Sequence, residues 1–231
     1  PMAPEVLEDM LEAASRASTC GNMQLYSLIV TQSRELREAL APCHFNQPMV
    51  TQAPCVITVC ADVHRFSMWC EQRDAEPCYD NFAWFLNGVT DALLAAQNLC
   101  VEAEAHGLGI CYLGTTIYTA EEIARILDLP KGVIPVTTIV VGHPDESPEL
   151  TDRLPLDAVV HCEKYHHYTS SEIDELWAEK ETSEETRRLL EENGLPNLAQ
   201  IFTRNRYRAE DNLAISRNYF ALLKKQGFFN N

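Results

Sequence analysis

The segments of this sequence that could do chemistry are loops in which neutral polar residues alternate with apolar ones. Two of them run from Ser18 to Gln24 and from Pro42 to Pro48. The sequence shows no P-loop, no GxGxxG after a strand, no HExxH helix and no Ser/His/Asp arrangement. Hydrolase, kinase and metalloprotease chemistry therefore lacks its usual signatures. Neutral, partly apolar loops instead suit a flat, uncharged ring with an anionic tail.

The nine cysteines indicate buried thiols rather than disulfides or a metal centre. Their number is odd, no CxxC pair occurs, and no secretory signal implies an oxidising compartment. Cys55 and Cys60 lie in an apolar run, where cysteine behaves as a small hydrophobe. One grouping, His161-Cys162 with His166-His167, resembles a metal site, but its spacing matches no familiar zinc pattern. We therefore expect no metal.

Composition indicates a globular protein with one α/β domain, or one domain and an appendage. The chain has 231 residues, of which 46% are hydrophobic, enough for a sizeable core. No apolar run approaches the roughly 18 to 20 residues of a membrane span, and the first residues lack the order of a signal peptide. The net charge of −16 disfavours nucleic acid and anionic membranes as partners. We expect a cytoplasmic protein that binds neither.

Apolar periodicity predicts the elements that must position the loops. Residues 4–16 have the spacing of an amphipathic helix, and residues 25–30 are predicted to form a strand. The run Cys55–Ala61 is apolar on both faces, which is typical of a central strand covered by helices. Residues 81–106 repeat apolar positions every three to four places and predict a long, mostly buried helix that ends at Gly107.

The remaining elements complete an α/β pattern. Residues 110–113 predict a short strand and residues 136–141 a longer one. Between them, Thr119 and Glu122 have the spacing of a capping box for a helix that reaches Leu129.

After residue 160 the sequence becomes charged and helical. Thr169 with Glu172 forms a second capping-box pattern, and residues 212–226 predict the last helix. We expect a main domain over residues 1–160 and a helical C-terminal extension over residues 161–231, which packs on the core or on a partner subunit.

Five short motifs follow one another in the chain. They are Ser18-Thr-Cys-Gly-Asn-Met-Gln24 before a strand, Phe45-Asn46 ahead of Met49-Val-Thr-Gln-Ala-Pro54, Gly107-Leu-Gly-Ile-Cys-Tyr-Leu-Gly114 after the long helix, Val140-Val-Gly-His-Pro144, and Arg153-Leu-Pro-Leu156. No single motif is specific. In content and order, however, the series resembles the nitroreductase family over roughly residues 4–160.

The resemblance implies a site for FMN. Its residues would be Thr19, Cys20, Asn22, Gln24, Asn46, Leu113, Gly114 and Arg153. Neutral amides suit the edge of the flavin ring, which carries carbonyl and imide groups. Gly114 would let an amide approach the N5/O4 edge, and Arg153 offers a planar fork for the phosphate. Structural alternatives remain: Asn22 as a cap or turn, Gly114 in a tight loop, and Arg153 paired with a neighbouring aspartate.

The resemblance also implies architecture and reaction. The expected fold is α/β (α+β), a mixed sheet flanked by helices in a domain-interlocked homodimer, with each FMN contacted by both chains. In the implied ping-pong reaction, NAD(P)H gives hydride to flavin N5, the product leaves, and a small electron-poor acceptor such as a nitroaromatic or quinone takes the electrons. No side chain need act as acid or base, so no catalytic residue is expected.

Other functions stay open at this point. The same family includes reductive dehalogenation and enone reduction, and a non-catalytic flavin-binding dimer is a third possibility. The aromatic residues near the start of the long helix also have two interpretations, because they either line the acceptor pocket or pack in the core. They are Tyr79, Phe82, Trp84 and Phe85.

Overall fold

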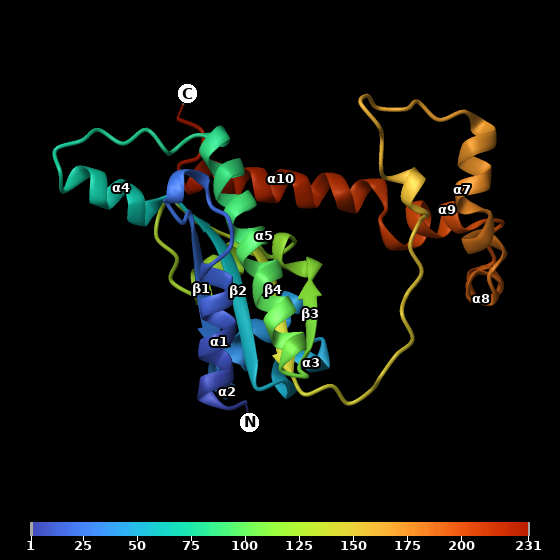
Figure 1. Ribbon diagram of the computed structural model, residues 1–231, viewed down its shortest axis with the longest axis horizontal. Coiled ribbons are helices and arrows are strands. Elements are labelled where there is room, and N and C mark those ends of the chain that lie inside the picture. Colours follow the sequence, from blue (N-terminus) through green and yellow to red (C-terminus); the bar gives the residue numbers. More distant parts are fainter. Residues whose placement is uncertain (1, 231) are drawn as a thin grey trace. The chain divides into compact units, whose positions relative to one another are not determined.

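The computed structural model describes residues 2–230 and contains one four-stranded sheet with helices against its faces (Figure 1). Its strands are β1 (Tyr26–Thr31), β2 (Cys55–Asp62), β3 (Gly109–Leu113) and β4 (Val133–Gly142). Its α-helices are α1 (Pro4–Ser15), α2 (Arg34–Leu40), α3 (Pro48–Gln52), α4 (His64–Glu71), α5 (Phe82–Ala105), α6 (Ala120–Ile126), α7 (Ser170–Thr182), α8 (Glu184–Asn193), α9 (Leu198–Ile201) and α10 (Ala209–Lys225). Within residues 2–230, no helix is long and apolar enough to cross a membrane.

The strands pair antiparallel in the order β1-β2-β4-β3. Thr58 of β2 lies opposite Ile29 of β1 on one side and Thr138 of β4 on the other. Every residue of β2 is buried, which confirms that Cys55–Ala61 forms a central strand covered on both faces. Both ladders satisfy its backbone groups, so an uninterrupted apolar run is tolerated at this position.

Different helices cover the two faces of the sheet. Side chains alternate along a strand, so Ile57 and its neighbour Val56 point to opposite faces. Ile57 packs with Met10 of α1 and Leu99 of α5, and Figure 1 shows these two helices side by side against the sheet. Val56 packs instead with Val50 of α3. The loop that carries Thr19 to Gln24 leads from α1 into β1, and Leu113 and Gly114 lie where β3 ends.

The chain divides into two compact units, and the division does not fall at the boundary expected near residue 160. One unit runs to Asp145 and resumes at Ile215, and the other spans Glu146–Ala214. The C-terminal residues belong to the first unit because Leu222 of α10 packs in a buried cluster with Phe85 of α5. The helices expected over residues 161–231 therefore belong partly to each unit.

The four aromatic residues with two interpretations pack in the protein interior or against it. Phe85 is 6% exposed, and Trp84 packs against the same cluster. The ring of Tyr79 meets that of Trp84 edge-on at 4.6 Å between centroids. Phe82 is partly exposed and stacks on Phe229, with 5.9 Å between centroids. For Tyr79, Trp84 and Phe85 these contacts favour core packing over an acceptor pocket, whereas Phe82 keeps an exposed face.

One predicted capping box forms and the other does not. Thr169 accepts from the Glu172 amide, and the Glu172 carboxylate accepts from the Thr169 amide, which confirms the box at the start of α7. At α6 the Thr119 side chain makes no cap. Its Oγ1 donates instead to the carbonyl of Cys43 at 2.8 Å. The Thr119 hydroxyl therefore makes a tertiary contact with the turn Ala41–His44 and does not form the cap of α6 that the local pattern had predicted.

Candidate functional site

A buried carboxylate organises the first predicted site loop. Asp91 of α5 is 2% exposed and accepts three hydrogen bonds from this loop. Thr19 Oγ1 donates to it at 2.5 Å, the Cys20 amide at 2.9 Å and the Leu25 amide at 3.1 Å. Thr19 Oγ1 also accepts from the Gln24 amide at 2.9 Å. The loop therefore folds around one carboxylate of the long helix.

The same loop turns through left-handed backbone conformations. φ is 55° at Gly21, 56° at Asn22 and 47° at Gln24. Glycine adopts such angles without steric cost, and asparagine tolerates them better than most residues. Gln24 Nε2 donates to Asn22 Oδ1 at 2.8 Å, and Asn22 is exposed. Asn22 does make a turn, and the two amides lie together at the surface.

Arg65 is a cation beside this loop that sequence reasoning did not single out. Its guanidinium donates to the carbonyl of Gln24 and, at 3.1 Å, to the carbonyl of Tyr26. It also donates to Ser27 Oγ at 3.1 Å and pairs with Asp62 at 3.3 Å. These contacts tie the start of β1 to the end of β2. They also place a positive charge next to the predicted amides.

The turn that holds Asn46 contacts the turn that follows β3. His44 Nδ1 and Thr115 Oγ1 are hydrogen-bonded at 2.8 Å. The ring centroids of Phe45 and Tyr118 are 6.2 Å apart. Thr119, just before α6, adds a third contact through its bond to the Cys43 carbonyl. The structure therefore brings Asn46 close to the predicted residues at the end of β3, although they lie far apart in the sequence.

Leu113 is buried, whereas its neighbour Gly114 faces open space. Leu113 is 2% exposed and packs with Val56 and Val140 under the sheet. A Cβ added at Gly114 would meet no atom within 4 Å, and its backbone is outside the left-handed region. Neither packing nor backbone conformation within the chain calls for glycine at this position. The open side of Gly114 leaves room for another molecule to approach the backbone closely.

His44 is fully buried beneath this turn. Burial lowers the pKa of its imidazole to about 4, so the ring is neutral at pH 7. Its Nε2 atom has no hydrogen-bond partner among the described residues. Sequence reasoning missed both His44 and Asp91. The signal for Asp91 was available, because an acid within an apolar helical pattern is expected to be paired.

Arg153 belongs to the unit Glu146–Ala214, whereas the other predicted residues belong to the first unit. Its Nη1 donates to Thr151 Oγ1 at 2.6 Å and to the Asp152 carbonyl at 2.8 Å. The Asp152 carboxylate pairs with Lys180 at 2.9 Å rather than with Arg153. Within residues 2–230 Arg153 makes no ion pair. The alternative that Arg153 pairs with a neighbouring aspartate is therefore not observed.

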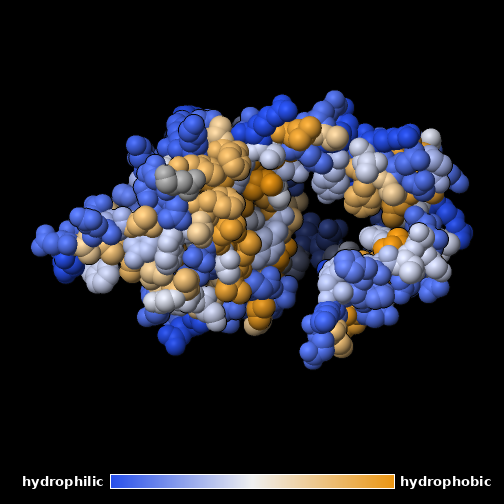
Figure 2. Space-filling model, turned by 90° about the horizontal axis from the view of Figure 1, so that it is seen from above, coloured by the Kyte–Doolittle hydropathy of each residue, from blue (hydrophilic) through white to orange (hydrophobic). Residues whose placement is uncertain are grey.

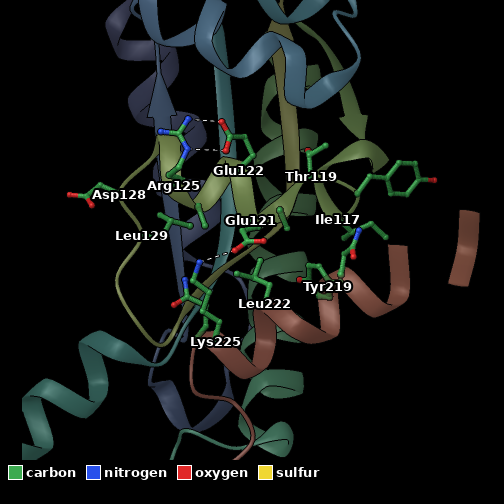
Figure 3. A pocket seen from close by; sticks show the side chains of 15 residues that line it. Ile117, Thr119, Glu121, Glu122, Arg125, Asp128, Leu129, Tyr219, Leu222 and Lys225 are labelled. Atoms are coloured by element: carbon green, nitrogen blue, oxygen red, sulfur yellow. Dashed lines mark hydrogen bonds and ion pairs between the residues drawn. The ribbon is translucent and has the colours of Figure 1, made fainter. Parts of the chain in front are cut away.

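A separate pocket of about 700 Å³ lies between α6 and α10, next to the turn after β3 (Figure 3). Ile117 is among the residues that line it, and an ion pair of 2.7 Å joins Glu121 and Lys225 across it. None of the eight residues predicted to bind the cofactor lines it. The pocket therefore adjoins the candidate site without forming it.

The neutral groups suit a flat, neutral ring. Contacts among the described residues join the turns of Asn46 and Gly114, but they do not join either turn to the loop of Asn22 and Gln24. Asn22, Gln24 and Asn46 are neutral donors and acceptors, and Gly114 exposes backbone to open space. The imidazole of His44 is buried, and its lowered pKa of about 4 keeps it neutral at pH 7. Such a site can bind and orient a reactive ring, while the chemistry belongs to the ring itself.

Replacing Asp91 by asparagine tests the role of the buried carboxylate. An amide cannot accept from three donors with the strength of a carboxylate, and its own NH₂ would face amide donors. We expect Asp91→Asn to lower the free energy of unfolding in urea by about 3 kcal/mol. Glu104→Gln, on the exposed face of the same helix, serves as the control and should change it by less than about 0.5 kcal/mol. Equal effects of the two substitutions would contradict the assignment.

Comparisons with known proteins identify the family. Residues 1–143 match the family described as Nitroreductase family. The FMN reductase (NADPH) of Bacillus subtilis strain 168 is 32% identical over 167 residues, which are 71% of this chain and 67% of that protein. The NADPH-dependent oxidoreductase of Staphylococcus aureus strain USA300 is 35% identical over 170 residues, 72% of this chain and 67% of that one.

A solved structure extends the similarity to almost the whole chain. A protein of Bacteroides fragilis NCTC 9343 superimposes with a TM-score of 0.96 and 49% identity, covering 99% of this chain and 93% of that one. The similar fold therefore includes the helices that follow the matched family region. On the family match and these relatives, this chain belongs to the nitroreductase family.

Proposed function

We propose that this protein is an FMN-dependent oxidoreductase that passes hydride from NAD(P)H to a small electron-poor acceptor. The observation that carries the proposal is the turn at Gly114. The buried side chain of Leu113 and the His44–Thr115 hydrogen bond hold this turn on its buried side. On the other side, the position of a Gly114 Cβ faces open space. A rigid backbone amide beside open space is what stabilising charge at a flavin N5/O4 edge requires.

The predicted residues would divide the binding of FMN among them. Asn22, Gln24 and Asn46 would hydrogen-bond the edge of the ring, and the Gly114 backbone would approach its N5 side. Arg153 would pair with the phosphate, for which its planar guanidinium is well shaped. Thr19, Cys20 and Leu113 would act through backbone position, because the first two are held by Asp91 and the third is buried.

When bound, FMN supplies the hydride-accepting and hydride-donating atom, N5. The chain's own residues bind and orient the reactants. His44 is neutral and buried and Asp91 is engaged with three donors, so neither of these two groups is placed to transfer a proton to a reactant. The protein therefore contributes position and local dipoles, so acceptors that need no enzymatic acid, such as quinones and nitroaromatics, suit it best.

The names of relatives support the donor and the cofactor. The curated relatives are named FMN reductase (NADPH) and NADPH-dependent oxidoreductase. These names favour NADPH as donor and make free FMN a further acceptor to test.

Visible absorption spectroscopy tests the proposal directly. The protein is mixed with FMN, titrated under anaerobic conditions with NADPH or NADH, and then given a quinone, a nitroaromatic, a halogenated aromatic, an enone or free FMN. We expect bound-flavin bands that bleach with the nucleotide and return with the acceptor. The identity of the acceptor that restores the bands fastest separates quinone or nitro reduction from dehalogenation and enone reduction. A protein that leaves the FMN spectrum unchanged does not have the proposed function.

Gly114→Ala separates cofactor binding from folding. The added methyl meets open space within the chain and needs no strained backbone, so the thermal midpoint of the apo protein should be unchanged. The same methyl would intrude on a bound ring, and we expect the FMN dissociation constant to rise by about tenfold or more.

Gly107→Ala provides the opposite control. A Cβ at Gly107 also meets open space, but φ there is +70°. It should lower stability by roughly 1 kcal/mol through backbone strain and leave the FMN dissociation constant unaffected. If the two variants bind FMN equally well, Gly114 does not contact the cofactor.

We further propose that the chain forms a homodimer, in which residues 1–160 carry FMN and the extension over residues 161–231 packs on the core or the partner. Figure 2 shows hydrophobic residues gathered in patches on the surface of the larger unit. On α5, large apolar side chains are exposed between 40% and 57% along one stripe. They are Phe82, Leu86, Leu93, Leu94 and Val101. Exposed apolar stripes of this kind mark protein interfaces.

Light scattering after gel filtration tests the dimer. The wild-type protein should have twice the 26.1 kDa mass of one chain. Leu93→Lys places a charge in the exposed stripe of α5 and should weaken association by about tenfold or more. Met68→Lys, an equally exposed apolar position on α4, should leave the mass unchanged. A wild-type monomer, or a Leu93→Lys protein that remains as dimeric as the control, would exclude this interface.

A further inference from the structure

Two consecutive residues of the Asn46 turn have left-handed backbone angles. φ is 54° at Phe45 and 54° at Asn46. A left-handed angle is common for asparagine but a genuine outlier for a bulky aromatic residue, because Cβ crowds the following carbonyl oxygen. Three backbone hydrogen bonds enforce the turn. The amides of Phe45, Asn46 and Gln47 donate to the carbonyls of Pro42, Ala41 and His44.

The turn is anchored from below and is not a loosely held surface loop. His44, directly before Phe45, is fully buried and bonded to Thr115. The neighbouring Cys43 is 3% exposed, and its carbonyl accepts from Thr119. The strained conformation of Phe45 is therefore imposed by its surroundings, and the direction of its side chain follows from that backbone.

The phenyl ring gains little from the rest of the chain. Phe45 is 62% exposed, and the described residues give its ring one aromatic neighbour, Tyr118, tilted at 47° with 6.2 Å between centroids. A glycine would take the same backbone conformation without strain and would expose less apolar surface. Burial of the ring therefore does not offset the backbone strain. A functional role of the exposed ring would explain why the strain is kept.

The ring lies at the rim of the proposed flavin site. Asn46 is its chain neighbour, and the contacts of His44 and Tyr118 join this turn to the one that begins at Gly114. Ile117 on the second turn is also 40% exposed. The turn of Gly114 thus carries an exposed aliphatic side chain, and the turn joined to it carries an exposed aromatic ring.

We propose that Phe45 is a specificity-determining residue that offers an apolar wall to flat aromatic acceptors in the site above Gly114. The inference rests on the proposed function, since it needs flavin at that site. Offset or edge-to-face contact with an acceptor ring would favour quinones and nitroaromatics with fused or extended rings over small acceptors that have no aromatic face.

Four variants separate this role from a structural one. Phe45→Gly removes the ring and the strain, Phe45→Ala removes the ring alone, and Phe45→Tyr keeps the ring. Trp69→Ala removes a similarly exposed aromatic residue, 53% exposed, from α4 and is the control. Each protein is loaded with FMN and examined for its thermal midpoint, its FMN dissociation constant and the rates of the two half-reactions.

The expected pattern is specific to one half-reaction. In Phe45→Gly and Phe45→Ala, kcat/KM for 1,4-naphthoquinone should fall by about tenfold. Flavin bleaching by NADPH and reoxidation by molecular oxygen should stay within about twofold, since neither needs an aromatic wall at the acceptor. Phe45→Gly should be at least as heat-stable as the wild type, because its strain is relieved. Phe45→Tyr and Trp69→Ala should resemble the wild type throughout.

A binding measurement provides a readout that does not depend on turnover. Naphthalene-2-carboxylate, which accepts no hydride, is titrated into the oxidised FMN-loaded protein, and its dissociation constant is taken from the change in the flavin spectrum. We expect the constant to rise in Phe45→Gly and Phe45→Ala in parallel with the loss of naphthoquinone activity. A ligand that binds all variants equally overturns the proposal.

The outcomes also separate this proposal from the one on which it rests. A wild-type protein that binds no FMN, or whose flavin NADPH does not bleach, overturns both. A wild-type protein that reduces naphthoquinone while Phe45→Gly does so equally well overturns only the role of Phe45. A Phe45→Gly protein that loses heat stability and FMN together shows that the ring is structural, and this also overturns the proposal.

Discussion

The Asp91 carboxylate holds the long helix α5 to the loop that enters the sheet, and the candidate site depends on this attachment. Its three donors come from a short loop whose backbone passes through several left-handed conformations. A loop of that kind is costly to order, because its residues lose conformational freedom and some of them are strained. Charge-assisted hydrogen bonds to one buried acceptor supply the needed stabilisation, since leaving such donors unpaired in the interior would cost more.

The second part of the site depends on the same principle with weaker interactions. The turns around Asn46 and Gly114 are joined by a neutral imidazole, a hydroxyl and a ring contact, all in an apolar layer under the sheet. Burial keeps the pKa of His44 low, so the imidazole that joins the two turns stays neutral. One part of the site is thus fixed by a buried carboxylate and the other by neutral hydrogen bonds and packing.

Periodicity was sufficient to predict the main elements and the central place of β2. The apolar run Cys55–Ala61 could only be satisfied with helices on both of its faces, and the long helix over residues 81–106 left few alternatives. Local signals were less reliable where another part of the chain competed for the same group. Thr169 caps α7 because its surroundings leave the hydroxyl free, whereas Thr119 gives its hydroxyl to the carbonyl of Cys43. A capping pattern cannot reveal that competition.

By itself, the sequence determined the order of the strands and of the longer helices, although not α3 and α4, together with the neutral polar character of the site loops and the resemblance to the family. These features follow from residue type and short-range spacing. Only the tertiary structure decided that Asp91 gathers Thr19, Cys20 and Leu25, that the turns of Asn46 and Gly114 meet, and that Phe45 is held strained and exposed. The physical reason is that each of these features is a contact between residues distant in the chain. Hydrogen-bond partners and backbone strain are set by where the folded layers meet, which no local pattern specifies.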